Sequence, residues 1–212
     1  MERTFGQRVF YSFLRIASRA IGILFFRLRV VGRENYPRDG AALICANHQS
    51  FFDPVLVGLT CERRMNYLAR ESLFKVPVLK QLIRYLDAIP IDRDGMGLAG
   101  LKETLRRLKR GEMVLIFPEG TRTADGELQP LKPGFCSLAR RGRAPLVPVG
   151  LDGAYQAWPR TQRLPGLAAL YLVIGEPLSP QLVESLTDDA LVAEVQRRLA
   201  DCLAKARAGR TR

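Results

Sequence analysis

The sequence has few of the side chains that usually bind metals or act as nucleophiles. It contains a single histidine, His48, and its four cysteines are far apart, with no Cys-x-x-Cys pair. So few nitrogen and sulfur ligands argue against a structural zinc site. We therefore expect no resident metal and no cofactor, and we expect the cysteines to be buried free thiols in a reducing compartment.

The sequence also lacks any run of about eighteen consecutive apolar residues, so it predicts no membrane-spanning helix. The nearest stretch, residues 7–30, is interrupted by Arg8, Arg15 and Arg19 and has no evident cleavage site, so we do not interpret it as a signal peptide. In a helix these arginines form a narrow polar stripe opposite a broad apolar face. Such a helix suits a membrane interface or packing on its own domain, and we assign residues 1–34 to this amphipathic N-terminal segment.

Acidic residues are few relative to basic ones. The 21 Asp and Glu against 33 Lys and Arg give a net charge of +12 and a pI of about 10.1. A surface of this sign attracts anions, which leaves three classes of partner: nucleic acid, an acidic membrane face, or a small substrate rich in phosphate.

Short apolar runs alternate with helical patterns along the rest of the chain. The strands are predicted at residues 43–47 (ending near Ala46), 65–69, 88–91, 114–117, 146–150 and 170–175. Helices are predicted at 54–61, 78–86, 98–110, 135–142 and 188–206, followed by a frayed tail. This alternation predicts an α/β fold with a largely parallel β-sheet flanked by helices. We place the main α/β domain at 35–180, and 181–212 belongs to it as a C-terminal helix and basic tail.

The lone histidine lies in "CANHQSFFDP", between the end of a predicted strand and the start of a helix. Asp53 and Pro54 are typical of a helix start, with Asp53 as N-cap. In a turn, Asp53 can fold back onto one imidazole nitrogen of His48 and leave the other free to take a proton. The same residues are also compatible with a polar loop that does no chemistry. Because no nucleophile motif accompanies them, a catalytic His48 would activate a substrate hydroxyl directly.

A second polar cluster follows the predicted strand in "VLIFPEGTR". Glu119, Gly120, Thr121 and Arg122 come at its carboxyl end, where glycine permits close backbone approach and arginine can grip a phosphate with two hydrogen bonds. In "AIPIDR", Arg93 stands just past another strand. Two arginines at one sheet edge would form an anion clamp beside the histidine.

At this point the sequence resembles the glycerolipid acyltransferase family. Four blocks match in order: "NHQSFFD", the N-H-x4-D motif of the family, then "AIPIDR", "FPEGTR" and "LVPVG". They span residues 47 to 150. The resemblance implies transfer of a fatty acyl group from acyl-CoA or acyl carrier protein to the free hydroxyl of a lysophospholipid, in particular lysophosphatidic acid. It also implies an N-terminal helical segment that attaches the enzyme to the cytoplasmic face of an anionic membrane as a peripheral, monotopic protein.

The resemblance further assigns residue roles. His48 becomes the general base and Asp53 its orienting partner, and we expect backbone donors near the motif to stabilise the oxyanion. The residues that it implies for substrate binding are Asn47, Arg93, Glu119, Gly120, Thr121, Arg122, Lys132 and Pro148, with Pro148 on the acyl or thioester side. One departure is Asp87, where the family commonly has glycine, and this acid bears on the identity of the acceptor.

Two other interpretations compete with this one. "GMGLAG", residues 95–100, matches the dinucleotide-binding G-x-G-x-x-G pattern and opens a predicted helix. Charged residues separate its first glycine from the preceding strand end, which argues against a nucleotide-binding oxidoreductase. A basic nucleic-acid- or membrane-binding protein without catalysis agrees with the charge, but no nucleic-acid fold pattern is present, and we expect no nucleic-acid partner.

Overall fold

The strands form one sheet of mixed direction in the computed structural model, which describes residues 5–70, 88–91 and 98–211. The strand order is β1-β7-β6-β2-β5-β3-β4. The strands are β1 (Arg29–Val31), β2 (Ala42–Ala46), β3 (Met65–Arg70), β4 (Ala88–Ile91), β5 (Met113–Ile116), β6 (Leu146–Asp152) and β7 (Tyr171–Ile174). All neighbouring pairs are parallel except β6 and β7. The predicted α/β fold with a largely parallel sheet is therefore confirmed.

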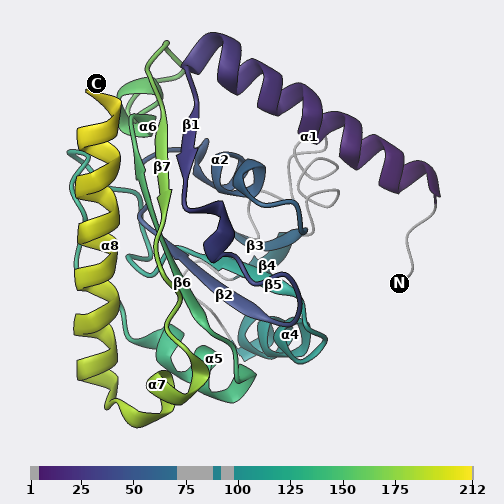
Figure 1. Cartoon of the computed structure of the whole chain (residues 1–212), viewed down its shortest axis with the longest axis vertical. Coiled ribbons are helices and arrows are strands. Elements are labelled where there is room, and N and C mark those ends of the chain that lie inside the picture. The colour runs from purple at the N-terminus through teal and green to yellow at the C-terminus, as the bar shows by residue number, and fades with distance from the viewer. Residues whose placement is uncertain (1–4, 71–87, 92–97, 212) are drawn as a thin grey trace.

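Helices cover both faces of this sheet (Figure 1). They are α1 (Phe5–Phe26), α2 (Asp53–Thr60), α4 (Leu98–Lys109), α5 (Gly134–Gly142), α6 (Ala154–Ala157), α7 (Pro180–Ser185) and α8 (Asp188–Arg210), with a short 3-10 turn η1 (Arg33–Asn35). Successive residues of β6 alternate between two cores, as the period of a strand requires. Val147 and Val149 join the core under α2, whereas Leu146 joins the core under α5 and α8.

The C-terminal helix is longer than the sequence predicts, because α8 continues to Arg210 and residues 207–210 are not frayed. Its last turns are held by side chains from the rest of the domain. Arg207 forms an ion pair with Glu127 at 2.8 Å, and Arg210 pairs with the buried Asp152 at the end of β6. The predicted helix at 78–86 lies outside the described residues.

The N-terminal helix α1 extends away from the sheet and meets the domain mainly at its C-terminal end (Figure 1). Leu28 N donates a hydrogen bond to Gly22 O, and Leu170 N donates one to Phe26 O, both within 3.0 Å. Beyond these contacts several apolar side chains remain exposed, at Ile16, Ile21, Ile23, Leu24 and Phe25. No helix in the described part of the chain is both long enough and apolar enough to cross a bilayer.

Candidate active site

His48 and Asp53 meet in the turn between β2 and α2. His48 Nδ1 lies 2.7 Å from Asp53 Oδ2, and Asp53 is fully buried while the His48 side chain keeps 19% of its surface exposed. Because a carboxylate accepts, we assign the proton of the neutral imidazole to Nδ1. Among the described residues, Nε2 has no hydrogen-bond partner, so this nitrogen is the one available to a substrate proton.

Asp53 is the first residue of α2 and does not cap the helix, so the N-cap prediction is wrong. Phe52 occupies the N-cap position without a side-chain cap. The reason is that Asp53 Oδ2 already accepts from the backbone amides of Gln49, at 2.6 Å, and Ser50, at 2.7 Å. Burial raises the pKa of the Asp53 carboxyl, whereas the hydrogen bonds from His48 and these two amides lower it.

Most backbone amides of this turn point at acceptors inside the protein. Besides Gln49 and Ser50, the amide of Phe52 donates to Ser50 Oγ at 3.2 Å, and His48 N donates to Glu119 Oε1 at 2.6 Å. These groups are therefore not available to an oxyanion. Our expectation that backbone donors near the motif stabilise the oxyanion does not hold for these four amides.

The segment after β5 fixes the backbone and the ring of His48. Thr123 N donates to His48 O at 2.8 Å, opposite the bond from His48 N to Glu119. The imidazole stacks on Phe117, with ring centroids 3.9 Å apart and planes 15° apart. The backbone N–H and C=O of His48 and one face of its ring are thus held, which orients Nε2.

Glu119 connects two loops and is buried. Its Oε1 accepts from His48 N and its Oε2 accepts from Gln129 N at 2.9 Å. Burial raises the pKa of Glu119 to about 7, because desolvation outweighs the two amide hydrogen bonds. The contacts give Glu119 a role in positioning His48, and its implied contact with a substrate stays a prediction.

Asn47 and Gln49 make a similar pair of internal contacts on either side of the histidine. Asn47 Nδ2 donates to Leu151 O at 2.9 Å and its Oδ1 accepts from Leu151 N at 2.7 Å, so both ends of the amide are occupied by β6. Gln49 Nε2 donates to Gly126 O at 3.0 Å and its Oε1 accepts from Tyr155 N. Gln49 and Thr123 were missed in the sequence, since their partners are distant in the chain.

Cationic and hydroxyl groups gather beside this turn on the segment after β5. Gly120 has a φ of +73°, and the side chain of Lys132 lies against it so closely that an added Cβ would be 3.0 Å from Nζ. The guanidinium of Arg122 lies 3.5 Å above the ring of Phe51. Thr121 is exposed next to it. The contacts of Glu119 and Thr123 with His48 thus bring the segment 119–123 beside the His48 turn, and Lys132 lies against Gly120 of this segment.

Arg93 lies outside the described residues, as does Asp87. Pro148 is in β6 on the face of the sheet covered by α8, where its Cγ and Cys202 Sγ both border Gly175. Its assignment to the acyl or thioester side stays a prediction.

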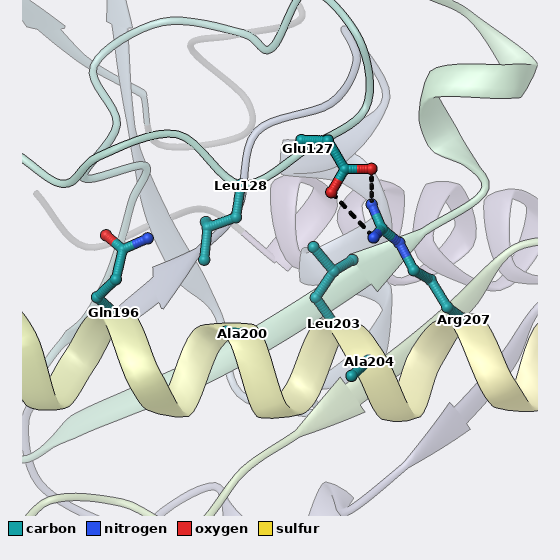
Figure 2. A pocket seen from close by; sticks show the side chains of 7 residues that line it. All are labelled: Glu127, Leu128, Gln196, Ala200, Leu203, Ala204 and Arg207. Atoms are coloured by element: carbon teal, nitrogen blue, oxygen red, sulfur yellow. Dashed lines mark hydrogen bonds and ion pairs between the residues drawn. The ribbon is translucent and has the colours of Figure 1, made fainter.

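A surface hollow of about 470 Å³ lies between α8 and the residues around Leu128 (Figure 2). Leu128 and Leu203 contribute apolar side chains to its lining, and the Glu127–Arg207 ion pair also borders it. None of its lining residues belongs to the predicted site, so the volume of this hollow does not identify the substrate pocket. Within the described residues no group of three His, Cys, Asp or Glu is arranged to hold a metal ion.

Comparison with known proteins identifies the class of enzyme to which this chain belongs. A family model described as "Acyltransferase" matches residues 27–152, which include the His48 turn and the segment after β5. A solved structure, the 1-acyl-sn-glycerophosphate (LPA) acyltransferase PlsC from Thermotoga maritima, superposes with a TM-score of 0.82 at 27% identity. The match covers 98% of this chain and 85% of the Thermotoga maritima chain. Fold and family model together identify an α/β acyltransferase.

Two relatives with similar sequences indicate which acyltransferase family this is. The 1-acyl-sn-glycerol-3-phosphate acyltransferase of Bacillus subtilis is 34% identical over 79% of this chain and 82% of its own length. The chloroplastic BAT2 acyltransferase of Brassica napus is 28% identical over 87% of this chain, which spans only 55% of that plant protein. The chain belongs to the glycerolipid acyltransferase family and is an enzyme of this type, not an oxidoreductase.

Proposed function

We propose that the protein transfers a fatty acyl group from a thioester, acyl-CoA or acyl carrier protein, to the free hydroxyl of lysophosphatidic acid, forming phosphatidic acid. The observation that carries this proposal is the contact between His48 Nδ1 and Asp53 Oδ2 at 2.7 Å, with Nε2 left available. The names of the bacterial and plant relatives support the choice of acceptor.

The mechanism is a single displacement. His48 Nε2 takes the proton of the acceptor hydroxyl as its oxygen attacks the thioester carbonyl, and Asp53 stabilises the imidazolium that forms. Collapse of the tetrahedral intermediate expels the thiolate, which takes the proton from His48. No enzyme nucleophile takes part, so rapid quenching with a labelled thioester should trap no acyl-protein.

Arg122, together with Lys132 and Arg93, holds the phosphate of the acceptor in this proposal. Arg122→Ala should raise the KM for lysophosphatidic acid and leave the KM for monoacylglycerol, which lacks the phosphate, unchanged. Arg141→Ala on the exposed surface of α5 is the matched control and should change neither value. An equal loss with both acceptors would argue against a phosphate contact.

The enzyme works at the cytoplasmic face of an anionic membrane, attached through α1. Support comes from the exposed Ile21, Leu24 and Phe25 at the end of this helix, together with the net charge of +12. Leu24→Ser with Phe25→Ser should reduce sedimentation with anionic vesicles. Unchanged sedimentation of this variant would reject α1 as the attachment.

A further inference from the structure

The loop between α6 and β7, which is distant from α1 in the sequence, exposes two large apolar side chains. Leu164 is 79% exposed and Leu167 is 75% exposed, both in residues 158–169 between α6 and β7. Isolated exposed leucines are common on soluble proteins, but two of them in one short loop mark a candidate contact site when the charge and the position of the loop agree with it.

The loop is held in place by hydrogen bonds at several points. Gly166 N donates to Ala157 O at 2.7 Å, and the indole Nε1 of Trp158 donates to Gln162 O at 3.1 Å. Ser50 Oγ donates to Trp158 O at 2.8 Å, which ties the start of the loop to the His48 turn. The leucines are therefore presented by a defined backbone.

The charge of the loop indicates what it contacts. Arg160 and Arg163 are exposed and precede the two leucines, and residues 158–169 contain no Asp or Glu. Cations beside apolar side chains match the surface of an anionic bilayer, where headgroups attract the arginines and the acyl region receives the leucines.

The loop is also continuous with the exposed end of α1. Leu170 N bonds to Phe26 O, and in Figure 1 the connection from α6 to β7 rises beside the C-terminal end of α1. Phe26 and Trp158 both contact the ring of Phe52, with centroids 5.7 Å and 4.9 Å away. Phe52 belongs to the turn that carries His48 and Asp53, so this surface leads directly to the candidate active site.

We propose that the loop of residues 158–169 is a second lipid contact that inserts Leu164 and Leu167 into an anionic phospholipid bilayer. The inference builds on the proposed membrane attachment but adds a separate element to it. Its consequence is that α1 and the loop hold the His48 turn at the bilayer surface, so that a lysophospholipid reaches the base without leaving the lipid phase.

Trp158 is the one tryptophan of the chain and lies at the start of the loop, so all tryptophan fluorescence of the protein comes from this position. The full-length protein is mixed with vesicles of phosphatidylcholine and phosphatidylglycerol that carry bromine on the acyl chains near the headgroups. Trp158 emission should be quenched. Leu164→Ser with Leu167→Ser should weaken vesicle binding by at least about tenfold and abolish the quenching even when α1 keeps the protein bound. Thr161→Ser with Gln162→Ser, in the same loop, is the matched control and should behave like the wild type.

Two further comparisons separate this proposal from its rivals. Arg160→Ser and Arg163→Ser should each weaken binding to anionic vesicles about fivefold and leave binding to neutral vesicles unchanged. The proposal is overturned if Trp158 of vesicle-bound wild type shows no quenching, or if the leucine substitutions instead convert a dimer into a monomer without changing vesicle binding. Acyltransfer to a dispersed short-chain acceptor is measured in parallel, because failure there rejects the proposed function and leaves the quenching result intact.

Discussion

Asp53→Asn isolates the effect of the Asp53 charge on His48. In the wild type three donors converge on Asp53 Oδ2, namely His48 Nδ1 and the amides of Gln49 and Ser50, all within 2.7 Å. Asparagine has nearly the same shape, and its oxygen can still accept from the two amides. It carries no charge to stabilise an imidazolium. Because all three donors point at the one Oδ2 position, an amide oxygen there binds the imidazolium more weakly, and an amide nitrogen there would face two backbone N–H donors, so either orientation of the side chain impairs the base. We expect kcat to fall about a thousandfold to ten-thousandfold.

The same substitution should change stability only moderately, because part of the hydrogen bonding is kept. A loss of about 1–3 kcal/mol in the free energy of unfolding is expected, measured by urea titration followed by circular dichroism. Asp152→Asn is the matched control: Asp152 is nearly as inaccessible, at 2% exposure, but its partner is Arg210 of α8 and not the histidine. This control should lose stability and keep its kcat. Retention of most of the wild-type kcat by a folded Asp53→Asn protein would refute the role assigned to the pair.

Three other substitutions test separate parts of the structure. Burial raises the pKa of Glu119 to about 7, compared with about 4.5 in the unfolded chain, so the folded state binds this proton more tightly. The contribution of Glu119 to the free energy of unfolding therefore falls as the pH rises between these two values. The advantage of wild type over Glu119→Gln in unfolding free energy should therefore shrink by at most about 3 kcal/mol between pH 4.5 and 7, and a constant difference in urea titrations would contradict this. Gly120→Ala places a Cβ at a φ of +73° and should cost about 1 kcal/mol, with Lys132 able to move aside; a thermal melt that matches wild type would show that the turn relaxes freely. Gly150→Ala directs a Cβ into the backbone of Cys202 and Leu203 on α8 and should cost about 3 kcal/mol by the same titration; an unchanged free energy of unfolding would contradict this close approach.

The central strands and the His48–Asp53 contact were predictable because their signals are local. Each strand from β2 to β6 is a short apolar run, and the two residues of the pair are five positions apart in one turn. β1 was missed, because its three residues have an exposed–intermediate–exposed pattern and become a strand only by pairing with β7. The end of α8 was missed because its contacts are distant in the chain: Arg207 pairs with Glu127, and Gly209 allows the ring of Tyr171 to pack against the helix.

The internal roles of Asn47 and Glu119 could not be read from the sequence. Both residues lie in the blocks that resemble the acyltransferase family, so a substrate contact was the natural interpretation of each. Their partners are 104 and 71 positions away, at Leu151 and His48, and only the strand order brings those segments together. Local patterns identify which side chains are polar and buried, but the sheet topology decides what those side chains hold.

The most direct test compares wild type with His48→Ala for the formation of phosphatidic acid from a long-chain acyl-CoA and lysophosphatidic acid. The reaction is run on vesicles, and the product is measured by mass spectrometry. His48→Ala should keep the circular dichroism spectrum and vesicle binding of the wild type, because the backbone bonds of residue 48 to Glu119 and Thr123 do not need the imidazole. Its rate should fall about a hundredfold to ten-thousandfold. A rate close to that of the wild type would contradict the assignment of His48 as the general base.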